Sequence, residues 1–129
     1  MAFYRTGGGG SATETVLWTN GSPTSSFAAQ TVTLSQSMEN FKYLKFKAYG
    51  SVNNYLEINI IVAVDEFKHS LKSGTVVGFG ICGANSGTSA NRKVWYSSDT
   101  KVEFSSATAG SNTYNNASIP LEIIGIKEA

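Results

Sequence analysis

Hydrophobic and polar residues alternate with a period of two over long stretches of this chain. In residues 55–64 every second side chain is a large aliphatic one, namely Leu56, Ile58, Ile60, Val62 and Val64. Residues 43–49 alternate in the same way. Because successive side chains of a strand point to opposite faces, each stretch predicts an antiparallel strand with one face on a core and the other in water.

Six more strand-length segments are separated by Gly, Asn and Ser. They are residues 15–19, 30–34, 76–82, 93–97, 101–104 and 121–127. The spacers are too short for crossover helices, residues 97–100 predict a tight hairpin, and only 35–41 and 66–71 could form a turn of helix. We therefore predict an all-β fold, a two-sheet antiparallel sandwich of about eight strands, of jelly-roll or related Greek-key type.

Five residues, Gly7–Gly10 and Ser11, separate a short head from the body of the chain. A chain of 129 residues is long enough for one domain with its own core. We expect residues 1–12 to be an N-terminal anchor or linker, and residues 13–129 to be the sandwich domain. The candidate assembly anchor in the head is Phe3, Tyr4 and Arg5. The glycines are either native or a remnant of an expression vector.

Charge argues against two classes of partner. Ten basic and nine acidic residues give a formal charge of +1, and neither sign is concentrated in one segment. A phosphate backbone or an anionic membrane requires a basic surface, so we expect no nucleic-acid partner.

The longest apolar run, residues 60–64, is far shorter than the roughly 20 residues that cross a bilayer, so we expect no membrane insertion. The head also lacks an apolar segment of signal-peptide length.

Side chains that perform chemistry are sparse. His69 is the only histidine, and no second His or thiolate stands at ligand spacing, so we expect no metal and no other cofactor. The chain has no Gly-x-Ser-x-Gly motif. Paired carboxylates for glycoside cleavage remain open, drawn from Asp65, Glu66, Asp99 and Glu103. The residue types nevertheless favour a protein without enzymatic activity.

The only cysteine, Cys82, lies in the apolar stretch 76–82. Free cysteine is among the most buried residue types, so we expect a buried thiol without a disulfide partner. Gly78 and Gly80 lie inside the same strand pattern. They predict a bulge or a close backbone approach within the sandwich.

Three polar loops, residues 50–55, 83–92 and 110–116, combine amide groups with a Tyr or Arg. Such mixtures suit saccharide or protein recognition, although turns also need Asn, Gly and Ser for their geometry alone. The candidate receptor or ligand contacts are Asn53, Asn54, Tyr55, Asn85, Arg92, Tyr114, Asn115 and Asn116. Trp18 and Trp95 could stack on sugars, or be buried, since each lies in a predicted strand.

Two segments near the ends of the chain carry a resemblance. Residues 17–34, LWTNGSPTSSFAAQTVTL, followed by FKYL at 41–44, resemble the opening of small domains in tail and receptor-binding proteins of phages and prophages of gut bacteria. The closing IPLEIIGIK at 119–127 is similar to the final strand of such proteins. The resemblance implies a β-sandwich, commonly trimeric, that is fixed to a tail or virion by one end and exposes loops at the other.

Residues and resemblance together predict a non-enzymatic phage virion structural protein, a tail-associated receptor-binding or host-attachment module docked through its N-terminus. The partners implied are other virion proteins through the N-terminal segment, further copies in a homo-oligomer with a trimer favoured, and a cell-surface glycan or protein receptor. Its location would be the virion, assembled in the bacterial host cytoplasm. Two alternatives remain: a capsid decoration or head-fibre protein, and a carbohydrate-binding module of a secreted protein.

Overall fold

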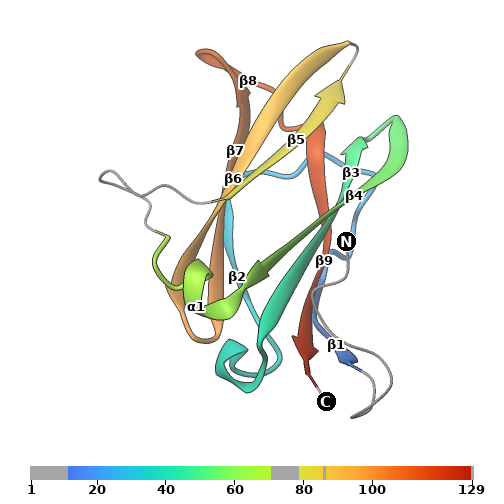
Figure 1. Cartoon of the computed structure of the whole chain (residues 1–129). Coiled ribbons are helices and arrows are strands. Elements are labelled where there is room, and N and C mark those ends of the chain that lie inside the picture. The colour runs from blue at the N-terminus through green and yellow to red at the C-terminus, as the bar shows by residue number, and fades with distance from the viewer. Residues whose placement is uncertain (1–11, 71–78, 86, 129) are drawn as a thin grey trace.

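Nine strands in the described part of the chain form two antiparallel sheets that pack face to face (Figure 1). The structure is a computed structural model, and it describes residues 12–70, 79–85 and 87–128. Sheet A has the strand order β1-β9-β3-β4, and sheet B has the order β2-β7-β6-β5, with β8 paired to β7. The strands are β1 (Thr13–Thr19), β2 (Gln30–Thr33), β3 (Tyr43–Ser51), β4 (Asn54–Ala63), β5 (Phe79–Asn85), β6 (Thr88–Ser98), β7 (Lys101–Ala109), β8 (Asn112–Thr113) and β9 (Ala117–Lys127).

The predicted all-β sandwich is confirmed, and most strands lie where the alternation placed them. The helical turn expected within 35–41 is present as a 3₁₀ helix, η1 (Met38–Asn40). The turn expected at 66–71 begins earlier, as a single α-helical turn, α1 (Val64–Phe67), so Val64 does not belong to the strand predicted for residues 55–64. The expected tight hairpin joins β6 to β7. Four strands are longer than expected: β5 extends to Asn85, β6 begins at Thr88 instead of near Lys93, β7 extends to Ala109, and β9 begins at Ala117. The short β8 was not expected.

The core lies between the sheets and is filled by inward-facing side chains of both. In β3, for example, Leu44, Phe46 and Ala48 are buried and alternate with half-buried residues. Each large aliphatic or aromatic side chain buried in this way stabilises the fold by roughly 1.5–3 kcal/mol. Aromatic rings pack in two groups, Trp18 with Phe27 and Phe104, and Phe46 with Phe67 and Tyr96.

The sandwich has two different ends (Figure 1). One, the loop end, carries the turns that join β3 to β4, β5 to β6 and β7 to β8, and the segment 114–116 before β9. The other, the terminal end, carries Thr13 and Lys127, which pair where β1 begins and β9 ends. η1 also lies there, since the Met38 N–H donates to the Asp99 carbonyl of the β6–β7 hairpin at 2.8 Å.

Candidate functional site

The turns of the loop end form one connected surface. The Val52 N–H donates to the Asn116 carbonyl at 2.9 Å, which ties the β3–β4 turn to the segment before β9. Arg92 of β6 reaches the same segment from the opposite sheet. Its guanidinium donates to the carbonyl groups of Ser118 and Ser105, both at 2.7 Å, of Ala117 at 3.1 Å and, more weakly, of Asn115 at 3.5 Å. A ligand at this end would therefore meet turns held in fixed relation to one another.

The prediction that Arg92 contacts a ligand from an exposed loop is wrong. Arg92 lies in β6, and its side chain is 0% exposed. The guanidinium carbon lies 5.1 Å from the centre of the Phe27 ring, a cation–π contact. Burial lowers the pKa of Arg92 to about 10, so the side chain is still charged at neutral pH. Arg92 therefore holds the loop end together from the inside.

Four of the predicted contact residues are exposed at the loop end, and the side-chain oxygen of one of them, Asn54, accepts the Leu56 N–H at 3.2 Å. Asn53 and Asn116 lie on the two turns that the Val52 hydrogen bond connects. Tyr55, 56% exposed, packs its ring on Tyr49 with 5.0 Å between the ring centres. Amide groups and an aromatic ring at the same end of the sandwich offer hydrogen bonds together with apolar contact area, as recognition surfaces do.

The remaining predicted contacts are placed differently. The Asn115 side-chain oxygen accepts the Ala107 N–H at 3.0 Å. Tyr114 is half-buried against a small cluster of alanines. Asn85 ends β5 at the loop end, and its side chain lies outside the described part of the structure. Asn115 and Tyr114 thus support the surface more than they extend from it.

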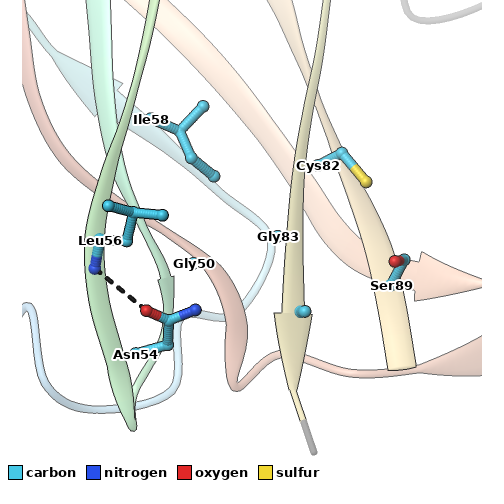
Figure 2. Close-up of a pocket in the computed structure, with 8 residues that line it drawn as sticks. Gly50, Asn54, Leu56, Ile58, Cys82, Gly83 and Ser89 are labelled. Carbon is cyan, nitrogen blue, oxygen red and sulfur yellow. Dashed lines mark hydrogen bonds between the residues drawn. The ribbon is translucent and has the colours of Figure 1, made fainter. Parts of the chain in front are cut away.

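A groove of about 300 Å³ opens between the edges of the two sheets at the loop end (Figure 2). One wall is the β3–β4 hairpin and the other is β5, so the edge strands of both sheets border it. Leu56 and Ile58 point from β4 toward β5 in Figure 2. The edge groove is lined by Gly50, Asn54, Leu56, Ile58, Cys82, Gly83, Ala84 and Ser89. Its volume is at the lower end of the range of small-molecule pockets.

The edge groove exists because small residues meet where the two sheets come closest. A Cβ atom on Gly83 would clash with the Gly50 carbonyl oxygen and would lie 2.8 Å from the Ser118 nitrogen. The two backbones therefore touch, and no large side chain of β5 stands there to cover β4. As a result Leu56 is 73% exposed, although the alternation places it on the inward face with the buried Val62.

The expected burial of Cys82 is wrong, because its thiol is exposed and Cys82 lines the edge groove. Ile81 takes the core position, so its neighbour in the strand faces the other way. The close backbone approach expected near Gly80 is made by Gly83 instead. A Cβ on Gly80 would meet only the side chain of Asn91, and Gly78 lies outside the described residues.

Both tryptophans pack within the protein. Trp95 is buried, and its Nε1 has no hydrogen-bond partner among the described residues. Trp18 is half-buried, with its ring 5.7 Å from that of Phe104 and 6.1 Å from that of Phe27. The sequence left open whether these tryptophans stack on sugars or are buried, and the structure favours burial for both.

The terminal end carries a network of charged side chains. Lys68 lies 2.9 Å from a Glu39 oxygen and 3.3 Å from an Asp99 oxygen, and the Tyr96 hydroxyl donates to Asp99 at 2.7 Å. The Tyr96 hydrogen bond, with help from Lys68, lowers the pKa of Asp99, while the same hydrogen bond raises the pKa of Tyr96. A general acid needs a raised pKa, so Asp99 is not tuned for that role.

Tyr96→Phe is expected to raise the pKa of Asp99 toward its ordinary value of 3.8, because it removes the hydrogen bond that stabilises the carboxylate most. A lowered pKa contributes stability above the pKa of the unfolded chain, and that contribution is lost as the pH falls through the folded value. The variant should therefore lose less stability on acidification. An NMR titration of the Asp99 carboxyl carbon measures the shift, with Tyr43→Phe as the control. An unchanged Asp99 pKa in Tyr96→Phe would contradict this assignment.

The other groups considered for chemistry have ordinary surroundings. The Nδ1 of His69 lies 2.8 Å from the Asp65 carbonyl oxygen one helical turn earlier. Across the described ranges, no three His, Cys, Asp or Glu side chains gather where they could hold a metal ion. No helix in the same ranges is long and apolar enough to cross a bilayer. The proposed anchor, Phe3, Tyr4 and Arg5, lies outside the described residues.

Comparison of the chain with protein-family models, with curated proteins and with solved structures finds no match. Function is therefore inferred from the geometry of the loop end and the edge groove, together with the resemblance of the two end segments.

Proposed function

We propose that this chain is a structural protein of a phage particle, without enzymatic activity, that is attached at its terminal end and binds the host-cell surface through its loop end. The proposal rests on the difference between the two ends of the sandwich. Thr13 and Lys127 lie together at one end, while the exposed Asn53, Tyr55 and Asn116 lie at the other. A module built in this way can be held on a particle and still expose its connected turns to a target.

The chemistry of the loop end supports a glycan or a protein receptor as the target. Amides provide paired donors and acceptors, and the Tyr55 ring provides an apolar face. The Val52–Asn116 hydrogen bond and the buried Arg92 hold these groups in place before binding, which reduces the entropy that a ligand must overcome. The resemblance of residues 17–34 and 119–127 to phage tail and receptor-binding proteins supplies the viral context.

The proposed function is tested by measuring how a fluorescent fusion, joined after residue 129, binds to a panel of gut-bacterial cells in flow cytometry. Asn53→Ala combined with Asn116→Ala is expected to weaken binding about thirtyfold or more, because central contacts each contribute more than about 1 kcal/mol. The matched control is Asn40→Ala, an exposed amide at the terminal end, which should bind as the unmodified protein does.

One outcome would contradict host binding, and another would contradict binding through the loop end. One is the absence of cell binding by a protein that purified particles do contain, which would favour the decoration role. The other is an equal loss of binding in the Asn40→Ala control, which would place the contact elsewhere on the sandwich.

A further inference from the structure

The outer face of sheet B carries a recess of about 240 Å³ between β6 and β7. This sheet recess shares no lining residue with the edge groove. Its volume is below the range of pockets that enclose drug-sized molecules, so it suits one small polar unit. The lining residues are Asn91, Lys93 and Trp95 of β6, and Ser105, Ser106 and Thr108 of β7.

The sheet recess lies where the two strands change register. Arg92 pairs with Ala107. Two residues further along β6, Val94 pairs with Phe104, so Lys93 alone stands opposite two residues of β7. This arrangement is a β-bulge, which interrupts the ladder and redirects side chains, and bulges are often found beside functional sites for that reason.

Hydrogen bonds hold the bulge in one shape. The Lys93 N–H donates to the Ser105 Oγ at 2.9 Å, and the Ser105 hydroxyl donates to the Ser106 carbonyl at 2.7 Å. From the inner side of the sheet, the buried guanidinium of Arg92 donates to the Ser105 carbonyl at 2.7 Å. The recess is therefore formed before a ligand arrives, which reduces the entropy that binding must overcome.

The sheet recess offers polar groups that the protein itself does not use. Lys93 is exposed and forms no ion pair with any residue that the structure describes. Within the same residues, the Asn91 amide and the hydroxyl groups of Ser106 and Thr108 have no hydrogen-bond partner. Trp95 shares the outer face of β6 with Lys93 and adds an apolar contact at the wall, although most of its ring is buried.

We propose that the sheet recess binds an acidic sugar, with the sugar carboxylate on Lys93 and the sugar hydroxyls on Asn91, Ser106 and Thr108. The ammonium group selects a negative charge, because a charge-assisted hydrogen bond is about twice as strong as a neutral one. The amide and the hydroxyl groups both donate and accept, as the hydroxyls of a sugar require. This site is additional to the loop-end contact and does not depend on it.

An NMR titration of the full-length, nitrogen-15-labelled protein with glucuronate tests the proposal. The backbone amides of Lys93 and Ser106 and the indole N–H of Trp95 should shift, whereas the indole N–H of Trp18 should not. Two further probes separate the parts of the ligand. Glucose has the ring without the carboxylate, and acetate has the carboxylate without the ring. Each should bind about tenfold more weakly than glucuronate or less tightly still.

Substitutions in the recess assign the contacts. Lys93→Gln keeps a polar side chain but removes the charge, so it should weaken glucuronate binding about tenfold and leave the weaker glucose binding unchanged. Ser106→Ala combined with Thr108→Val should weaken the binding of both sugars. The matched control is Lys101→Gln, an exposed lysine of β7 outside the recess, which should bind glucuronate as the unmodified protein does.

Several results would overturn the proposal. Equal affinity for acetate and glucuronate would make the recess a plain anion site, and equal affinity for glucose would remove the role of Lys93. The proposal would also fail if glucuronate shifted no resonance of the recess, or if Lys101→Gln weakened binding as much as Lys93→Gln.

Discussion

Arg92→Ala is expected to lower the free energy of unfolding by about 4 kcal/mol or more. The substitution empties a fully buried volume, and it leaves the carbonyl groups of Ser105, Ala117 and Ser118 without the donor that satisfies them. It also removes the hydrogen bond from Arg92 that helps to hold Ser118 in its backbone conformation. The φ of Ser118 is 53°, in the left-handed region that non-glycine residues seldom adopt. A loss of this size removes much of the stability of an ordinary domain, so the loop end should open first.

The measurement is urea unfolding followed by far-ultraviolet circular dichroism. Arg92→Lys keeps the charge but cannot reach several carbonyl groups at once, so it should fall between the alanine variant and the unmodified protein. The control is the neighbouring Lys93→Ala, which is exposed and should change stability by no more than about 0.5 kcal/mol. If Arg92→Ala lowered the free energy of unfolding by less than about 1 kcal/mol, Arg92 would not hold the loop end together as we infer.

Gly83→Ala is expected to cost about 3 kcal/mol, the upper part of the range for overpacked cores. The added methyl group would meet backbone atoms of Gly50 and Ser118, which belong to the other sheet and cannot rotate away. The sheets would have to separate where they come closest, and that separation would change the edge groove. Thermal unfolding measures the loss of stability, and the reaction rate of the Cys82 thiol measures the change in the groove.

Gly80→Ala is the matched control because it lies in the same strand. There the added methyl group would meet only the Asn91 amide, which is the far end of a flexible and exposed side chain. We expect a cost below about 1 kcal/mol. Equal losses in the two glycine variants would show that the backbone contact between the sheets is not what makes Gly83 necessary.

The alternation of residues 43–63 was sufficient to predict β3, which buries every second side chain, and β4, in which Val62 is buried and Ile58 and Ile60 are half-buried. It could not predict that Leu56 would be uncovered. Whether an inward-facing residue is buried depends on what the opposite sheet places over it, and Gly83 of β5 places no side chain there. The exposure of Cys82 has a similar origin, because Ile81 takes the core position in a strand that is apolar throughout.

The start of β6 was missed because its inward residues are not a hydrophobic set. Ala90 and Arg92 are the buried positions, and an arginine in a run of Asn, Ser and Gly looks like part of a polar loop. Only the folded chain shows that backbone carbonyl groups surround the guanidinium. The sequence also could not distinguish Asn115, whose side-chain oxygen accepts the Ala107 N–H of β7, from Asn53 and Asn116, which are exposed.

A cryo-electron microscopy reconstruction of phage particles that contain this chain would test the central claim most directly. It should show the sandwich attached at the end where Thr13 and Lys127 pair, with the β3–β4 turn and the segment 114–116 directed away from the particle. A sandwich with those turns packed against the particle, or purified particles without this chain, would contradict the account.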